Sequence, residues 1–357
     1  MAKAQDGRPG VGFVVQGFLL RTLWARLTPL ALATGLLGVA FAQPAARPRR
    51  EITLTAQSVP LSTAQPTLDR AGSAHFLGGL WLRSEDKGFG GLSGLTVEVE
   101  KDKSGLRMIA VTDEGDKFTA HLLVENARLR GVEAATLEPL VDLLGSPVSG
   151  KLLGDAESIT RLKDGRVLVG FERRHRIWAY GPGLTGPATL FETPAVLSRA
   201  PSNGGLESMT SWPDGRILAI TERLKTKAGN FEAFLFQGEA WTGLEWKGSG
   251  PGFEPTDATV LPNGDLLVLE RFWSALAPQS LSSRIMRVKG DSVKTGALLQ
   301  GELVAELKAP LIAENFEGIA AFRNAAGATQ VVLVSDNNFN SIQRTLLLWF
   351  EMPQDQD

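Results

Sequence analysis

The sequence predicts an all-β fold, a β-propeller of four-stranded antiparallel blades, and two observations carry this prediction. From Ile52 onward, short runs rich in Val, Leu, Ile and Phe alternate with Gly, Pro, Asp and Asn, and no amphipathic helix of useful length interrupts them. One hairpin pattern also recurs along the chain at a period of 50 to 64 residues, which indicates a repeat architecture. Four antiparallel strands per repeat are typical of a propeller blade.

Each repeat begins with a predicted β-hairpin. A carboxylate or hydroxyl opens one apolar run, Asp-Gly or Asn-Gly follows midway, and a second carboxylate closes the next apolar run in the clearest copies. Asp-Gly and Asn-Gly are the strongest short-range signals for a two-residue hairpin turn. The clearest copies span residues 155–173, 205–223 and 255–271, and weaker ones span 91–114 and 315–337. Five copies predict five blades, each with room for further strands.

The two ends of the chain are expected to close the ring together. The last copy keeps only one clear strand after its hairpin, at residues 345–351. A strand at residues 52–58 would supply the missing outer strand of that blade. Residues 75–83 are then left over, and a sixth, degenerate blade built there remains open.

The hairpins are expected to bring carboxylates together in pairs. In an antiparallel hairpin the turn fixes the register, because the residue numbers of opposed partners add to a constant. In the copy at residues 155–173, pairing about the turn at Asp164 and Gly165 places Glu157 opposite Glu172. The same reasoning gives Glu207 with Glu222, Asp257 with Glu270, Glu317 with Asp336, and Ser93 with Asp113. Like charges directly opposite on a sheet are destabilising, so such pairs predict a positive partner.

If these hairpins are the inner strands of the blades, their open ends meet around the central channel. The predicted metal ligands are the acids at these ends: Glu157, Glu172, Glu207, Glu222, Asp257, Glu270, Glu317 and Asp336. Carboxylate oxygens suit a hard cation, so Ca²⁺ or Mg²⁺ is the predicted cofactor. The alternative, which the sequence leaves open, is that the acids are structural and join neighbouring blades through arginines.

Three arginines directly follow a closing carboxylate, and they are Arg173, Arg223 and Arg271. Guanidinium groups bind phosphate and carboxylate groups well, so we predict that these arginines bind an anionic substrate. The predicted catalytic carboxylates are Asp113, Glu157, Glu207 and Glu317. Glu207 and Glu222 are the first choices for holding the cation, because they belong to the most regular copy. His175 fits an exposed loop better than a general base.

Composition and charge exclude several classes of function. The formal net charge over 357 residues is −2, which gives no electrostatic reason to bind nucleic acid or an anionic membrane. The chain has no cysteine, which excludes disulfides and zinc–sulfur sites. Its three histidines, His75, His121 and His175, lack the spacing of a metal motif. The expected partner is therefore a small molecule, a phosphoester or another anionic substrate.

The N-terminal region has the features of an export signal. Arg21 and Arg26 precede an apolar run that ends at Ala42 after small residues, which is the pattern of a secretory signal peptide. The predicted division of the chain is a signal peptide at 1–42, a disordered lead-in at 43–50 and a propeller domain at 51–357. A periplasmic or secreted location follows, and an uncleaved N-terminal anchor is the alternative.

Several ordered segments resemble the phytase-like domain family, also described as having the esterase-like activity of phytase. The segments are 91–95, 110–114, 155–159, 315–319 and 334–338. The likeness extends from Leu54 to the C-terminus, and it implies a propeller with repeated Glu and Asp and a phosphoester hydrolase activity. The chain departs from the pattern at an apparent insertion, residues 84–89, and at Ser93, where a carboxylate is expected.

Three functional hypotheses follow. The first is an exported metal-dependent hydrolase of phosphoesters, in which carboxylates at the channel mouth hold the cation. The second is a non-catalytic binding propeller of the envelope or the secreted fraction, whose acids are structural. The third is a Ca²⁺-dependent hydrolase of lactones or sugar esters.

Overall fold

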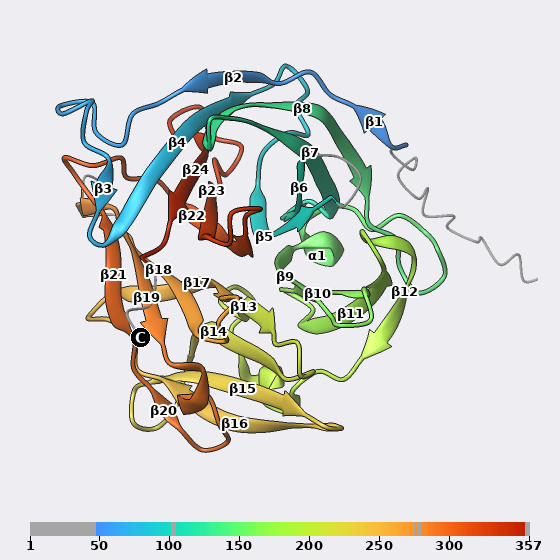
Figure 1. Ribbon diagram of the computed structural model, residues 1–357. Coiled ribbons are helices and arrows are strands. Elements are labelled where there is room, and N and C mark those ends of the chain that lie inside the picture. Colours follow the sequence, from blue (N-terminus) through green and yellow to red (C-terminus); the bar gives the residue numbers. More distant parts are fainter. Residues whose placement is uncertain (1–47, 101–104, 275, 278–279, 354–357) are drawn as a thin grey trace, which may run out of the picture. The chain divides into compact units, whose positions relative to one another are not determined.

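Five sheets, antiparallel except for one short added strand, surround a central channel in the computed structural model, which describes residues 48–353 apart from 101–104, 275 and 278–279 (Figure 1). The sheets are the blades of an all-β propeller, and their number confirms the count of five hairpin repeats. The predicted signal peptide, 1–42, and residues 43–47 of the lead-in lie outside the described residues. Within the described part, no helix has the length and apolar character to cross a membrane.

Each blade begins at the channel and continues outward along the chain. Blade one contains β5 (Leu92–Val99), β6 (Leu106–Thr112), β7 (Asp116–Glu125) and β8 (Arg128–Pro139). The short helix α1 (Lys151–Gly154) precedes blade two, which contains β9 (Ala156–Arg161), β10 (Val167–Phe171), β11 (Arg176–Gly181) and β12 (Thr185–Phe191). A 3₁₀ turn at Ala195–Arg199 leads to the next blade.

Blades three and four have the same order, and a short strand from the last connection of blade four is added to the edge of blade three. Blade three contains β13 (Leu206–Ser211), β14 (Ile217–Lys225), β15 (Phe231–Gln237) and β16 (Ala240–Trp246). Blade four contains β17 (Phe253–Val260), β18 (Leu266–Phe272), β19 (Ser282–Val288) and β21 (Glu302–Leu307). Between its last two strands, a 3₁₀ turn (Gly290–Ser292) leads to β20 (Leu298–Leu299), which pairs in parallel with β16 of blade three.

The fifth blade joins both ends of the chain, as predicted, but by a different strand. It contains β22 (Phe316–Arg323), β23 (Thr329–Ser335), β24 (Thr345–Glu351), β4 (Ala74–Arg83) and β2 (Thr55–Ser58), while β3 (Arg70–Ala71) pairs with β4. The leftover segment 75–83 thus lies in β4, which pairs directly with β24. No sixth blade exists among the described residues, and the predicted outer strand contributes only β2, as an additional edge strand.

The first described strand also ties two blades together. Strand β1 (Arg50–Glu51) pairs with β8 of blade one, while β2 pairs with β4 of blade five. Ile52, between them, donates its backbone N–H to the carbonyl of Ala135 at 2.9 Å. Sheet pairing thus starts at Arg50, one residue before the expected start of the domain, and a single segment bridges the junction where the ring closes.

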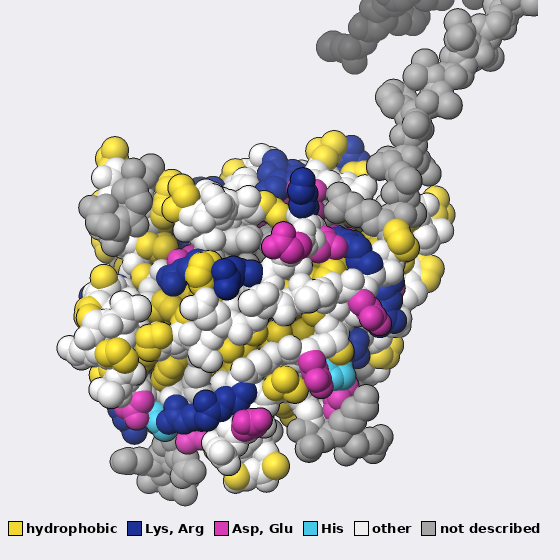
Figure 2. All heavy atoms as spheres, turned by 90° about the horizontal axis from the view of Figure 1, so that it is seen from above, with side chains coloured by type: hydrophobic (Ala, Val, Ile, Leu, Met, Phe, Trp, Pro, Cys, Tyr) yellow, Lys and Arg dark blue, Asp and Glu magenta, His cyan; other side chains and the backbone are white. Residues whose placement is uncertain are grey.

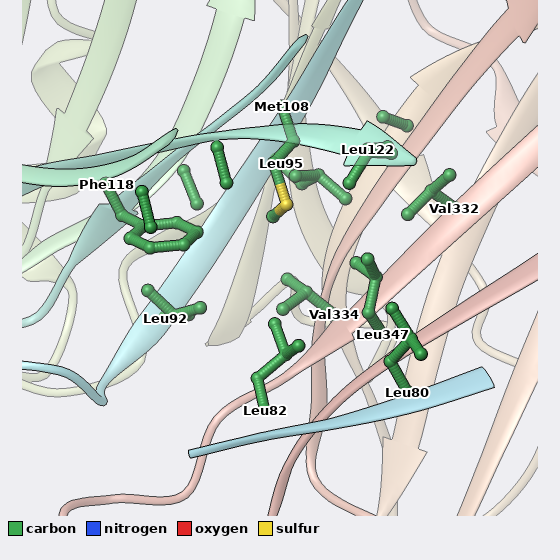
Figure 3. Packing of buried hydrophobic residues seen from close by; sticks show 14 of the residues in the cluster. Leu80, Leu82, Leu92, Leu95, Met108, Phe118, Leu122, Val332, Val334 and Leu347 are labelled. Carbon is green, nitrogen blue, oxygen red and sulfur yellow. The ribbon is translucent and has the colours of Figure 1, made fainter. Parts of the chain in front are cut away.

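Buried apolar side chains fill the space between blades one and five (Figure 3). Leu80 and Leu82 of β4 are 0% and 2% exposed, and they lie in one cluster with Val334 of β23 and Leu347 of β24. Blade one contributes Leu92, Leu95, Met108, Phe118 and Leu122. Strand β4, from the N-terminal part of the chain, therefore completes the core at the junction of blades one and five.

The hairpin turns contain three residues rather than the two that Asp-Gly predicts. Leu162 donates its N–H to the carbonyl of Arg166 at 2.8 Å, and Gly165 donates to the carbonyl of Leu162 at 3.0 Å. Gly165 adopts a left-handed φ of 88°, whereas Asp164 does not have the positive φ that a type I′ turn needs. A type I turn followed by a glycine bulge has these features. Gly215 and Gly264 repeat them, with φ of 96° and 93°.

This longer turn shifts the register by one residue, so the predicted direct opposition of carboxylates is wrong. Val169 pairs with Ile159 and Phe171 with Ala156, which leaves Glu157 in a β-bulge with no directly opposed residue. The residues in the corresponding bulges of the other blades are Gly94, Glu207, Thr256 and Glu317. In the first hairpin Ser93 pairs with Val111 rather than Asp113.

The outer side over blades one and five carries a mixture of side chains (Figure 2). Lys and Arg, Asp and Glu, and apolar side chains are interspersed there, and none of these types covers the face. This side therefore presents no continuous basic surface.

Replacing Leu80 with Ala tests the role of β4 in the ring. Because Leu80 is fully buried, we expect a loss of about 2–5 kcal/mol in the free energy of unfolding, measured by urea denaturation. Leu190→Ala, on the outer strand β12 at 76% exposure, should change it by less than about 0.5 kcal/mol. Equal effects of the two substitutions would contradict the assignment of β4 to the fifth blade.

Candidate functional site

One polar cavity of about 220 Å³ lies where the inner hairpins open. Eight carboxylates and three cationic side chains line it. The lining residues are Ser93, Asp113, Lys151, Asp155, Glu157, Glu172, Asn203, Glu207, Glu222, Arg223, Arg271, Glu317, Asp336 and Asn338. Most of the predicted site residues are thus gathered in one place. Six of the eight predicted metal ligands line the cavity, as do all four predicted catalytic carboxylates.

The hairpins place these acids at two equivalent positions. Glu157, Glu207 and Glu317 occupy the bulges of β9, β13 and β22. A bulge re-aims the side chain of its extra residue, which explains how a residue of a channel strand reaches the mouth. Glu172 and Glu222 each follow the last residue paired in their hairpin and donate a backbone N–H to the residue before the facing strand. Asp336 does the same in blade five.

Blade four breaks this pattern, and the predicted ligands Asp257 and Glu270 do not line the cavity. The bulge position is held by Thr256, and the closing position by Arg271, which pairs with Glu254. Counting residues from the hairpin turn would have located both Thr256 and Arg271 in the sequence. In blades two, three and four, the bulged residue lies seven positions before the Asp or Asn of the turn, and the closing residue lies eight positions after it.

Asp257 and Glu270 instead join blades within the protein. Asp257, 1% exposed, accepts hydrogen bonds at 2.8 Å from the backbone N–H groups of Ala258 and Ile319. Glu270, fully buried, accepts from the indole N–H of Trp246 at 2.6 Å and from the N–H of Ser249. Both carboxylates therefore have a structural role, and the expectation that they lie at the mouth is wrong.

The carboxylates of Asp155, Glu157 and Glu172 form the tightest group, with one oxygen of each within 4.8 Å of the others. Asp155 was missing from the predicted ligands, although it opens the second sequence repeat. It lies directly before β9, and its Oδ2 is 2.6 Å from Nε of Arg173. Arg173 thus contacts an acid of the site but does not line the cavity. The Ser93 hydroxyl of blade one hydrogen-bonds to Glu157.

Backbone amides from blade three fix the orientation of Glu172. Its Oε1 accepts hydrogen bonds from the N–H groups of Gly204, at 2.6 Å, and Gly205. A Cβ on Gly205 would lie 2.5 Å from the imidazole of His175 and 3.3 Å from Glu172 Oε1. Glycine is therefore required there by a close approach. His175 itself is partly buried against this loop, and its Nε2 lies 2.9 Å from the carbonyl of Pro201.

The cations are distributed unevenly around the ring. Arg271 reaches from blade four to Glu222 of blade three, at 3.0 Å, and to Glu317 of blade five. Arg223 lies 3.1 Å from Glu222 and 3.4 Å from Glu254. On the other side Lys151 lies 2.6 Å from Asp113. Glu157 and Glu207 have no cation within ion-pair distance among the described residues. The excess negative charge therefore lies towards blades two and three.

Burial and mutual repulsion favour the protonated forms of several acids. Burial, together with the charges of Glu222 and Asp336, raises the pKa of Glu317 to about 8 against the opposing effect of Arg271. Burial also raises the pKa of Glu222 and of Asp336 to about 7. The pKa values of Glu157 and Glu207 lie well above the usual range, because both are buried and surrounded by other carboxylates. A bound cation would oppose each of these shifts.

The donor set fits a hard cation. The clustered oxygens belong to carboxylates, which Ca²⁺ and Mg²⁺ prefer, and no thiolate or imidazole lines the cavity. Asp113, 4% exposed, has an Oδ1 that accepts no hydrogen bond from the described residues. Buried polar atoms without a partner are rare in proteins. The cavity can therefore hold a cation beside Asp155, Glu157 and Glu172 and an anion beside the cationic side chains.

Residues 87–339 match the protein family described as "Phytase-like: Esterase-like activity of phytase". No curated protein matches the sequence.

Similar solved structures include an endo-arabinase from Bacteroides thetaiotaomicron, with 14% identity, a TM-score of 0.45, and coverage of 76% of this chain and 96% of that one. An α-L-arabinofuranosidase from Podospora anserina has 9% identity and a TM-score of 0.48, over 83% and 98% of the two chains. A gluconolactonase from Xanthomonas campestris has 10% identity and a TM-score of 0.36, over 87% and 99%.

The raised pKa values predict how the metal-free protein responds to pH. The folded protein holds protons on Glu222, Glu317 and Asp336 more tightly than the unfolded chain does. The contribution of these groups to the free energy of unfolding is therefore lost as pH rises from about 4 towards 8. We expect the Tm in EDTA to be lower at pH 8 than at pH 5 by at least about 5 °C. Glu317→Gln should flatten this dependence. A Tm that rises over the same range would contradict the buried, crowded state of these acids.

Gly205→Ala tests the close packing behind Glu172. The added methyl group must displace His175 or the loop, so we expect a loss of about 1–3 kcal/mol in the free energy of unfolding. Gly243→Ala is the matched control, since a Cβ there has no atom within 4 Å. If both variants unfold at the same urea concentration as the parent protein, the loop does not hold Glu172 as described.

Proposed function

Since this chain belongs to the phytase-like family, we propose that it is an exported, metal-dependent hydrolase of phosphoesters that acts at the mouth of the propeller channel. One observation carries the proposal: eight carboxylates and three cationic side chains converge on a single cavity. A phosphoester requires both signs of charge. A cation neutralises its oxygens, and carboxylates hold the cation and move protons.

Asp155, Glu157 and Glu172 are the proposed ligands of the cation, and we propose Ca²⁺ or Mg²⁺ as the ion. The ligand oxygens lie within 4.8 Å of one another, and the Gly204 and Gly205 amides keep Glu172 in place. When bound, such a cation stabilises the negative charge that develops on the phosphoryl group. Arg173, at 2.6 Å from Asp155, positions that ligand.

Arg223 and Lys151 are the proposed contacts for the phosphate. Their side chains are 42% and 44% exposed, and they line the cavity from different elements, β14 and α1. Arg271 is only 14% exposed, and its guanidinium is shared by Glu222, Glu317 and Asn315. We therefore assign Arg271 to positioning these groups, in place of the direct substrate contact that the sequence suggests.

Hydrolysis forms a bond from a water oxygen to phosphorus and breaks the bond from phosphorus to the alcohol oxygen. Asp113 is the proposed acceptor of the water proton, because its buried Oδ1 has no other partner. Glu207 is the proposed donor to the departing alkoxide, because it lines the cavity and burial beside other carboxylates raises its pKa. The alcohol and inorganic phosphate are the products. Glu157 is a proposed ligand of the cation, and Glu317 holds Arg271 in place.

A non-catalytic role is the second candidate, and a specific observation favours it. Arg271 links Glu222 and Glu317, and thereby joins blades three, four and five. Glu172 joins blades two and three through the Gly204 amide. The acids would then stabilise the ring, with or without a structural ion. The expected periplasmic or secreted location, based on residues 1–42, is common to both proposals.

The test compares turnover of p-nitrophenyl phosphate after EDTA treatment and after addition of Ca²⁺, Mg²⁺ or Mn²⁺. We expect metal-dependent turnover that Glu157→Gln lowers by at least about 100-fold, because the variant removes a charged ligand. Glu239→Gln, on an exposed turn outside the cavity, should leave it unchanged.

Two results would reject the phosphoesterase. A Ca²⁺-dependent rise in Tm without turnover of any phosphoester would favour the non-catalytic propeller. Turnover of lactones or sugar esters, but not of phosphoesters, would favour the third hypothesis instead.

A further inference from the structure

A second cavity, of about 720 Å³, adjoins the acidic cavity at the channel mouth. Arg271 and Asn338 line both cavities, so the two are neighbours. The second cavity lies between the loop after β18 and the loop that joins β23 to β24. Nothing in the proposed hydrolysis uses it. Its place beside the phosphate site suits the alcohol part of the ester.

Part of the lining of this cavity is apolar. Trp273 comes two residues after Arg271 and is 58% exposed, although it lines the cavity. Ile342, at 85% exposure, Leu281 and Ala313 are the other apolar residues that line it. A large apolar side chain that stays exposed beside a charged site is a candidate ligand contact. The indole ring offers a flat apolar face to a ring of similar size.

Amide side chains with hydrogen-bonding capacity also line this cavity. Asn340 accepts from the N–H of Ile342 at 3.0 Å through its Oδ1, and Gln343 accepts from Nδ2 of Asn338 at 3.1 Å through its Oε1. The amide nitrogens of Asn340 and Gln343 have no acceptor among the described residues. They can therefore donate to oxygen atoms of a ligand.

The charged groups at this cavity are already neutralised. Glu314 accepts from the backbone N–H and from Nε of Arg344, both at 3.1 Å. Arg271 is engaged by Glu222 and Glu317. Neither side chain is left to bind a charged alcohol, so the occupant should be neutral. It should also offer an apolar face to Trp273 and oxygen atoms to the amides.

We propose that this cavity is a subsite for a neutral sugar ring, so that the substrates are phosphate esters of sugars. A sugar places its C–H face on the indole and its hydroxyl oxygens at the amide groups. A small alkyl group would leave Trp273 exposed, and a plain aromatic ring would leave the amides unpaired. The proposal rests on the proposed phosphoesterase and adds the part of the substrate that the enzyme selects.

The kinetic test uses glucose 1-phosphate and methyl phosphate in the presence of the activating cation. We expect kcat/KM to favour glucose 1-phosphate by at least about tenfold, since only this ester fills the subsite. Trp273→Ala should remove most of this preference and leave methyl phosphate within about twofold. Leu276→Ala is the matched control, since Leu276 lies in the same loop at 98% exposure and does not line the cavity. Equal kcat/KM for the two esters, or an equal loss for both in Trp273→Ala, would overturn the subsite.

A binding measurement separates this inference from the proposed reaction. Methyl α-glucoside, which has no phosphate, is titrated into the metal-free protein, and tryptophan fluorescence is recorded. We expect a saturable change that Trp273→Ala abolishes, that Gln343→Ala weakens several-fold, and that Leu276→Ala retains. Such binding without turnover of any phosphoester would keep the sugar subsite and reject the phosphoesterase. A fluorescence change that survives in Trp273→Ala, or no change in the parent protein, would overturn the subsite itself.

Discussion

Repulsion among carboxylates at one end of the channel is the constraint on which the rest of the structure depends. The propeller symmetry brings the open ends of the inner hairpins to one axis, and bulges place Glu157, Glu207 and Glu317 there. Acids buried together are costly unless they are protonated or compensated. The protein compensates some of them, through Arg271, Lys151 and the Gly204 and Gly205 amides. Glu157 of blade two and Glu207 of blade three have no cation within ion-pair distance among the described residues, so a divalent cation is most strongly favoured near them.

Blade four turns this symmetric ring into a site with two sides. Where the neighbouring blades have an acid at the closing position, blade four has Arg271, and Thr256 replaces the bulged glutamate. A ring of five equivalent acids would repel phosphate from every side. With Arg271 in place, Glu222 of blade three and Glu317 of blade five are held together by one guanidinium, and the group of Asp155, Glu157 and Glu172 lies apart from it in blade two. The proposed chemistry requires such a separation of charge.

The scaffold and the variable parts of the site come from different regions. Paired strands and the core shared by blades one and five hold the ring closed, and the N-terminal segment spans their junction. The loops that enter and leave the inner strands carry Lys151, Asn203, Trp273 and Asn338. Binding residues concentrate on loops positioned by a rigid scaffold. Such loops can set the choice of substrate without changing the acids below them.

The sequence by itself determined the all-β class, the five blades, the closure of the ring by both chain ends and the convergence of most of the acids, because apolar alternation and turn residues act locally and repeat. It could not determine the register, since Asp-Gly suits both two-residue and three-residue turns, and one extra turn residue moved Glu157 from a direct pair into a bulge. The fourth strand of blade five, the exchange of Glu270 for Arg271 and the addition of Asp155 were decided by tertiary structure. The fourth strand of blade five depends on contacts between segments far apart in the chain, whereas Arg271 could be located from the sequence only once the three-residue turn had fixed the register.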